Sequence, residues 1–147
     1  MKKVLSWPVY YQLSEIYTAP LNVVWFVYGA AMAFQQYHMF NLINILLCLV
    51  DVFLFDLVVN IADNYYDYLH GKDRHFLTDI NPIGRLKLPL TDVRNLVWIS
   101  YFISAIPGII LVYRTGWPVL IMGMWGILLE YFTLQGLSRW MQHRSVN

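Results

Sequence analysis

Four polar side chains follow one apolar stretch of the sequence at the spacing of a single helical face. Asp56, Asn60, Asp63 and Asp67 are separated by four, three and four residues, so a helix of about 3.6 residues per turn places them on one side. Asn64 borders this acidic stripe. Hydrocarbon does not solvate polar groups, so acids in a membrane span rarely face lipid. We therefore expect the acidic stripe to line a cavity between helices.

The ligand types in the acidic stripe favour magnesium. Carboxylate and amide oxygens, without a cluster of His or Cys, favour Mg²⁺ over zinc or copper. Gly71 is expected to end the helix, which places Asp63 and Asp67 in its last turns, where the helix dipole disfavours negative charge. A bound divalent cation, or basic residues in the following loop, would compensate them. The acidic stripe therefore offers oxygen ligands for Mg²⁺, without fixing which of its residues would bind the ion.

A basic loop follows the acidic stripe. Within it, Gly84 lies in the turn-forming stretch 81–85 and would let backbone approach a ligand closely. Carboxylates that hold a metal, followed by cations that bind the outer phosphate oxygens, are a common arrangement at diphosphate sites. At the rim of an apolar cavity, such a site would suit a substrate with a diphosphate head and a hydrocarbon tail. The basic residues are Lys72, Arg74, Arg85 and Lys87.

The composition is that of a membrane protein. Of the 147 residues, 59% are hydrophobic and only 13% are charged, which is too little charge to cover the surface of a soluble domain. The net charge of +1 provides no field that would attract nucleic acid, and the apolar content excludes a disordered chain. Cys48 is the only cysteine, which excludes a disulfide framework and a CxxC metal site.

Four apolar stretches come near the ~20 residues that a helix needs to cross a bilayer. We therefore expect one all-α domain over residues 1–147, a polytopic transmembrane bundle in which Pro107 kinks the third span. An amphipathic helix over Ser6–Tyr17 is expected to lie on the membrane surface before the first span. The expected spans are Pro20–Phe40, Leu42–Ala62, Leu96–Tyr113 and Trp117–Leu137.

Charge placement predicts the orientation in the cell membrane. All Lys and Arg residues except Arg114 fall in the N-terminus, the central loop or the C-terminus. By the positive-inside rule, both termini and the central loop are then cytoplasmic. Lys2 and Lys3 ahead of an apolar stretch also suit a cleavable signal peptide. However, the long segment before the apolar core, which includes Glu15, argues against cleavage.

The acidic segment resembles the first aspartate-rich region of a known enzyme superfamily. Asn60–Tyr68, followed by Gly71–Asp73 and Ile83–Arg85, is similar to that region in the UbiA superfamily of intramembrane prenyltransferases. Within the superfamily, it is most similar to the menaquinone branch, the 1,4-dihydroxy-2-naphthoate prenyltransferases. Weaker similarities at residues 15–20, 115–118 and 131–133 extend the resemblance over about residues 10–135.

The resemblance implies an Mg²⁺-dependent reaction of quinone biosynthesis. A prenyl group would pass from an allylic prenyl diphosphate to an aromatic quinone precursor. Asp63 and Asp67 would be the catalytic metal ligands and Asn64 would assist them, in an Asp-Asn order that inverts the usual Asn-Asp pair of the family. The residues that the resemblance assigns to the substrates are Asn60, Lys72, Asp73, Arg74, Arg85 and Tyr131.

The resemblance covers only the N-terminal half of the family's fold. In that family a second aspartate-rich half supplies further metal ligands, and no second DxxxD follows in these residues. Enzymatic activity of this chain alone is therefore left open. The alternatives are an enzyme completed by a second half-chain or a second copy, an inactive fragment, and a small cation-binding or transport protein. Lys72, Arg74 and Arg85 argue against a cation path, because they would repel the cation.

Overall fold

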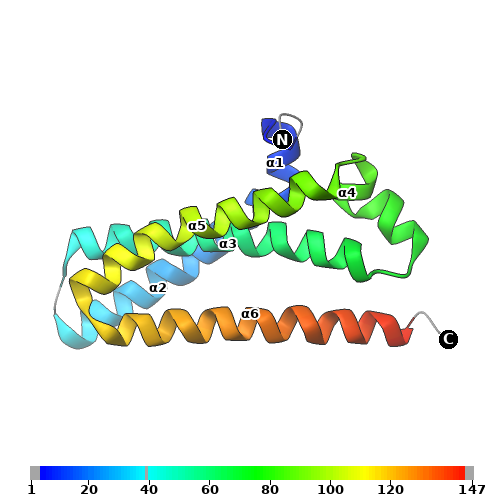
Figure 1. Cartoon of the computed structure of the whole chain (residues 1–147). Helices are drawn as coiled ribbons and strands as arrows, with labels where there is room; N and C mark the ends of the chain where they lie inside the picture. The colour runs from blue at the N-terminus through cyan, green and yellow to red at the C-terminus, as the bar shows by residue number, and fades with distance from the viewer. Residues whose placement is uncertain (1–3, 39, 145–147) are drawn as a thin grey trace.

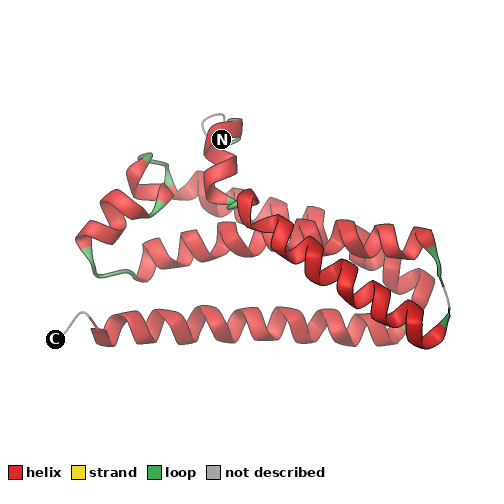
Figure 2. Ribbon diagram, turned by 180° about the vertical axis from the view of Figure 1, so that it is seen from behind, coloured by secondary structure: helices red, strands yellow, loops and turns green. Residues whose placement is uncertain are grey.

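The protein is described by a computed structural model that covers residues 4–38 and 40–144, with side chains described up to residue 133. Every regular element in this part of the chain is helical, which confirms the predicted all-α class (Figure 2). The longest helices run along a common axis (Figure 1). The elements are α1 (Trp7–Leu13), η1 (Ile16–Thr18), α2 (Ala19–Tyr37), α3 (Leu42–His70), η2 (Phe76–Ile80), α4 (Pro82–Arg85), α5 (Leu90–Thr115) and α6 (Trp117–Arg144).

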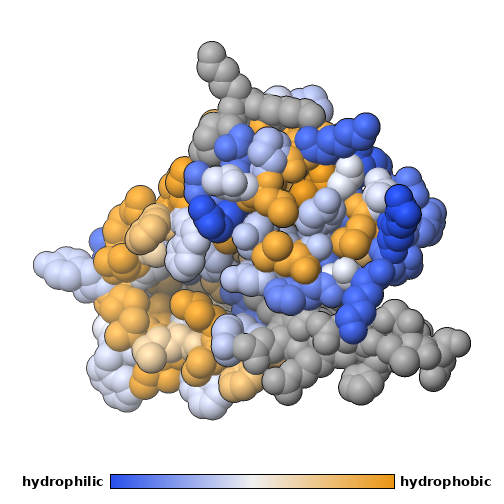
Figure 3. Space-filling model, turned by 45° about the vertical axis from the view of Figure 1, so that its right-hand side comes forward, coloured by the Kyte–Doolittle hydropathy of each residue, from blue (hydrophilic) through white to orange (hydrophobic). Residues whose placement is uncertain are grey.

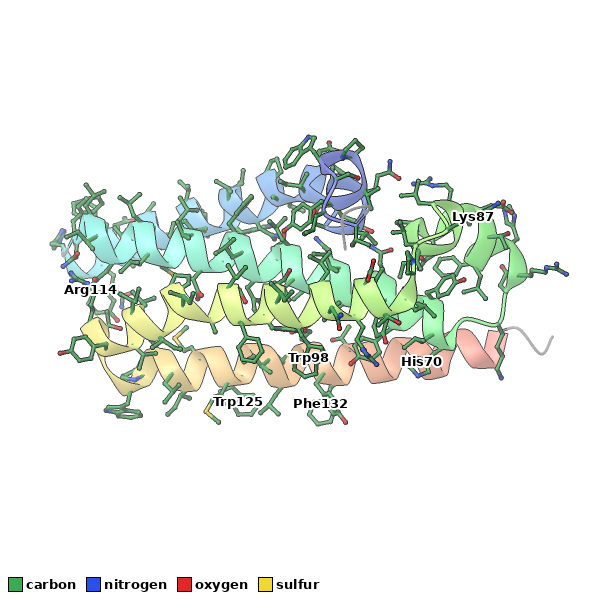
Figure 4. All side chains as sticks on the ribbon, turned by 45° about the horizontal axis from the view of Figure 1, so that its top comes forward. His70, Lys87, Trp98, Arg114, Trp125 and Phe132 are labelled. Atoms are coloured by element: carbon green, nitrogen blue, oxygen red, sulfur yellow. The ribbon has the colours of Figure 1, made fainter. Side chains whose placement is uncertain are left out.

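The long helices form two hairpins that turn at the same end. The α2–α3 connection and the α5–α6 connection at Gly116 lie at the left of Figure 1, whereas α1, α4 and the end of α6 lie toward the right. Figure 4 accordingly places Arg114 at one end of the bundle, and Lys87 and His70 at the other. The four long helices thus form a pair of hairpins, while their orientation in the cell stays a prediction.

Within the part of the chain that the structure describes, three helical segments are long and apolar enough to cross a membrane, namely Ile16–Tyr37, Leu42–His70 and Leu90–Thr115. Helix α6 covers the predicted fourth span, and the part of it with described side chains, Trp117–Thr133, is a shorter apolar stretch. Hydrophobic side chains cover much of the left flank of the molecule in Figure 3. The most hydrophilic ones gather toward the end that carries α4, which is turned forward in this view. These features support a membrane protein built from apolar helices.

Two helices extend beyond the apolar stretches that predicted them. The second apolar span ends at Ala62, and α3 continues through the polar half of the acidic stripe to His70, which confirms the predicted helix end at Gly71. Likewise, α5 begins at Leu90, ahead of the predicted start at Leu96. Hydropathy marks the stretch that prefers hydrocarbon, whereas helical hydrogen bonding continues through polar residues until a breaker such as Gly71 intervenes.

Close packing between α3 and α5 holds the bundle together. Small side chains at Ser100, Ser104 and Gly108 let the two helices approach each other. A Cβ atom at Gly108 would come within 3.0 Å of Oδ1 of Asp51, whose carboxylate accepts a hydrogen bond from the Gly108 backbone. The acid of this span is therefore satisfied by the neighbouring helix. The buried residues of α5 are Val93, Leu96, Val97, Ser100, Ser104, Pro107 and Leu111.

The N-terminal segment differs from the single amphipathic helix predicted over Ser6–Tyr17. Helix α1 ends at Leu13, and a 3₁₀ turn, η1, follows after Glu15, whose backbone is left-handed at φ 46°. In Figure 1, α1 runs across the long helices, so it lies in the membrane plane when they span the bilayer. Its buried residues Val9 and Leu13 join a hydrophobic core with α3, α4 and α5. The amphipathic helix is thus shorter than predicted, and its place on the membrane surface stays a prediction.

Gly84 offers a test of the loop packing. A Cβ atom there would lie 1.7 Å from the carbonyl oxygen of Leu77, so Gly84→Ala must displace backbone. We expect this change to lower the free energy of unfolding by about 2 kcal/mol or more. Gly123→Ala is the matched control, because nothing lies within 4 Å of a Cβ atom at that position. Thermal unfolding in detergent checks both, and an equal response of the two variants would contradict the packing.

Candidate functional site

The last turns of α3 bring several acids together at one end of the bundle. Asp63 and Asp67 lie one turn apart and are both partly buried. Asp63 is repelled by the negative charges of Asp67, Glu130 and Glu15. Asp67 is repelled by Glu15 and attracted by His70. Among the basic residues with described side chains, no Lys or Arg forms an ion pair with either aspartate. The predicted compensation by neighbouring basic residues is therefore not seen in this part of the chain.

Asn64 is turned toward the junction of α1 and η1. Its Nδ2 donates hydrogen bonds to the backbone oxygens of Leu13 at 3.1 Å and Asn60 at 3.0 Å, and to Oε1 of Glu15 at 3.2 Å. The side chain is buried. Its amide is thus used to hold the N-terminal segment against α3, a structural role that the prediction of a metal ligand did not include.

Asn60 extends the same attachment one turn earlier on α3. Its Nδ2 donates to the backbone oxygen of Ser14 at 3.0 Å and lies 3.4 Å from Oγ1 of Thr18. The amide nitrogen of Asn60 is therefore used to hold the N-terminal segment, and its predicted role in substrate binding stays a prediction. Together with Asn64, it fixes the turn that carries Glu15.

Glu15 is a site residue that sequence reasoning did not assign. Its left-handed backbone at φ 46°, ψ 38° is uncommon for a residue with a side chain. That conformation and the Asn64 hydrogen bond bring the carboxylate within range of both Asp63 and Asp67. The sequence shows that Glu15 is an acid shortly before an apolar span, which could have marked it as a candidate. Its contact with α3 depends on tertiary structure, which the sequence does not show.

Glu130 is the second acid that was not given a role. It comes from α6, and it accepts a hydrogen bond from the hydroxyl of Tyr101 on α5. Its charge also acts on Asp63 of α3, so three long helices contribute to this neighbourhood. The Tyr101 contact explains how α6 tolerates an acid within an apolar stretch.

Asp56 lies deeper in the bundle than the rest of the acidic stripe. Its Oδ1 accepts a hydrogen bond of 2.6 Å from Nδ2 of Asn22 on α2. Its other oxygen, Oδ2, is buried and has no hydrogen-bond partner in the part of the chain with described side chains. Asp56 therefore faces α2, and one of its oxygens is not satisfied by that helix.

The loop after α3 is fastened to the end of the acidic stripe by Asn81. Its Nδ2 donates to the backbone oxygen of Asn64 at 2.9 Å, and its Oδ1 accepts from the backbone nitrogen of Ile83 at 2.9 Å, which caps α4. The close approach predicted at Gly84 occurs with the carbonyl of Leu77 in η2, within the loop itself. Asn81 and Gly84 thus give this loop a fixed shape beside α3.

The predicted substrate residues are spread around this end of the molecule. Lys72 and Arg74 are exposed directly after α3, and Asp73 accepts a hydrogen bond of 2.9 Å from the backbone of His75. Arg85 donates from Nη2 to Oε1 of Gln12 on α1 at 2.7 Å. Tyr131 is exposed on α6.

Only two of these acids, Asp63 and Asp67, are placed to bind one magnesium ion together. Among the described side chains, no three of His, Cys, Asp and Glu lie close enough to hold a metal. Mg²⁺ is commonly held by one or two carboxylates, with water and substrate phosphates completing its six positions. Asp63 and Asp67 match that requirement. The amide nitrogen of Asn64 is committed to the α1–η1 junction.

Comparison of the chain with known protein families, with curated proteins and with solved structures finds no match in any of the three. The resemblance to the intramembrane prenyltransferases therefore stays a prediction from the residues. The geometry of the α3 end has to carry the functional argument.

The attachment by Asn64 can be tested by Asn64→Ala. The variant loses the side-chain donor to the backbone oxygen of Leu13 and to Glu15, so we expect the free energy of unfolding to fall by about 1–3 kcal/mol. Hydrogen exchange should become faster at residues 10–18. The matched control is Asn44→Ala, because Asn44 contacts Arg114 at the exposed, opposite end. Unchanged exchange in the N-terminal segment of Asn64→Ala would show that the attachment is made elsewhere.

Proposed function

We propose that the α3 end is the Mg²⁺-dependent diphosphate site of a prenyltransferase, which moves a prenyl group from an allylic prenyl diphosphate to an aromatic quinone precursor. One observation carries the proposal. Asp63 and Asp67 lie one turn apart at the end of an apolar helix, with further acids nearby and no basic partner among the side chains described.

Electrostatics support a cation at this place. Carboxylates that are partly withdrawn from water require a positive partner or a proton, and the nearby Glu15 and Glu130 add to the repulsion. Oxygen ligands of this kind suit Mg²⁺. When bound, Mg²⁺ would stabilise the negative charge that develops on the departing diphosphate.

The loop supports the diphosphate part of the proposal. Lys72 and Arg74 follow α3 directly and are exposed, so their side chains are available to phosphate oxygens. Asn81 keeps the loop against the end of α3. Arg85 was predicted to join them, but its hydrogen bond to Gln12 places its guanidinium against α1, so the proposal rests on Lys72 and Arg74.

The chain's residues have three tasks in this reaction. Asp63 and Asp67 would hold the Mg²⁺ ion, Lys72 and Arg74 would bind the outer oxygens of the diphosphate, and the apolar helices would shelter the hydrocarbon tail from water. The C–O bond of the prenyl diphosphate breaks, and its electron pair leaves with the diphosphate. A ring carbon of the acceptor then forms the new bond and loses its proton to solvent.

The proposal includes orientation and partners. The end that carries Lys72, Arg74 and Lys87 faces the cytoplasm by the positive-inside rule, and both termini share that side. The further metal ligands that such a reaction uses come from a second half-chain or a second copy. The aromatic acceptor follows from the resemblance alone.

A cation path is the second candidate, and Asp56 favours it. The unpartnered oxygen of Asp56, together with Asp51 further along α3, places acids through the depth of the bundle. Acids within spans often mark ion or proton paths. Asp51 is engaged with α5 at Gly108, so the path would depend on Asp56 alone in that region.

Asp67→Asn and Asp63→Asn test the prenyltransferase proposal. Each should reduce Mg²⁺-dependent transfer of radiolabelled prenyl groups to dihydroxynaphthoate in membranes by at least about 100-fold, because a metal ligand is lost. The matched control is Asp51→Asn, which removes a membrane acid outside the site and should leave transfer near the wild-type rate. EDTA should abolish transfer in all active samples.

The same preparations separate the two candidates. Transfer that persists in both Asp63 and Asp67 variants, or in the presence of EDTA, would refute the magnesium site. Absence of transfer by the wild type, combined with cation flux into vesicles that Asp56→Asn removes, would favour the cation path instead.

A further inference from the structure

We propose that Arg85 and a row of aromatic side chains on the N-terminal segment bind the headgroup of an anionic phospholipid at the membrane surface. The aromatic row consists of Trp7, Tyr11 and Tyr17. This inference does not depend on the prenyl-transfer proposal, since it concerns the outer side of α1 and η1.

The aromatic row is continuous and open to its surroundings. The ring centroids of Trp7 and Tyr11 are 6.2 Å apart, and those of Tyr11 and Tyr17 are 6.0 Å apart. Trp7 is 65% exposed and Tyr17 is 59% exposed, whereas Val9 and Leu13 on the same segment are buried. Trp and Tyr concentrate at the headgroup level of membranes, because their rings are apolar and their tips are polar.

Arg85 brings a positive charge to this row. Its Nη2 donates to Oε1 of Gln12 at 2.7 Å, which places the guanidinium against α1. Its charge acts on Tyr17, which also has the Glu15 carboxylate as a hydrogen-bond partner, so Arg85 supplies the positive charge of the row beside one acid. No acid among the described side chains forms an ion pair with it. A guanidinium has five N–H donors in a planar fork, so donors stay available for the oxygens of a phosphate.

The placement favours a lipid over a soluble anion. Helix α1 runs across the long helices, so the aromatic row lies in the plane of the membrane surface when they span it (Figure 1). A soluble phosphate would use the guanidinium but would have no contact for three exposed rings. A phospholipid uses both, since its phosphate meets Arg85 and its glycerol and upper acyl carbons meet the rings.

Lipid titration of the purified full chain by native mass spectrometry tests the site. Phosphatidylglycerol should bind about five- to tenfold more tightly than phosphatidylcholine with the same acyl chains. Arg85→Gln should remove this preference, because the amide can still contact Gln12 but carries no charge. Arg85→Lys should keep most of it. Trp7→Ala should weaken the binding of both lipids.

The matched control is Arg114→Gln. Arg114 also donates to a side-chain amide, at 2.8 Å from Asn44, but it lies at the opposite end of the bundle. It should keep the wild-type preference, and inorganic diphosphate in the buffer should not displace phosphatidylglycerol. Loss of preference in Arg114→Gln, retention in Arg85→Gln, or displacement by diphosphate would overturn the proposal. Displacement would assign Arg85 to the substrate site instead.

Discussion

An acid or amide inside an apolar bundle must find a polar partner, and the α3 helix shows how the structure meets this requirement along its length. Asp51 accepts a hydrogen bond from the backbone of α5 at Gly108, and one oxygen of Asp56 accepts a hydrogen bond from Asn22 of α2. Near the end of the helix, the asparagine amides contact the N-terminal turn. Asp63 and Asp67 differ, because the charges that act on them are mostly negative. Of the polar residues along α3, these two aspartates are therefore the ones that most favour a bound cation.

Much of the fold could be predicted because it follows from local rules. Apolar stretches of spanning length gave the bundle helices, and the spacing of Asp56, Asn60, Asp63 and Asp67 placed them on one side of α3. Local rules could not show how two neighbouring residues on that side divide their roles. Asn64 reaches the α1–η1 junction, whereas Asp63 lies near Glu130 of α6. That division depends on which helices pack on each side.

The missed features share a tertiary origin. The break in the N-terminal helix results from a left-handed residue held by a side chain far away in sequence, which propensity does not predict. The glycine of the basic loop was expected to admit a ligand, yet the loop's own carbonyl occupies that space. A glycine indicates close approach, but it does not identify what approaches.

The fastening of the first turn to α3 has a consequence for the order of assembly. The bonds from Asn60 and Asn64 join residues that are 46 and 51 positions apart, so their acceptors leave the ribosome well before their donors. The segment that carries the acceptors therefore cannot dock until α3 has been synthesised and inserted. Its aromatic side chains can hold it at the membrane surface during that time. The N-terminal segment then packs on α3, a helix that is synthesised later.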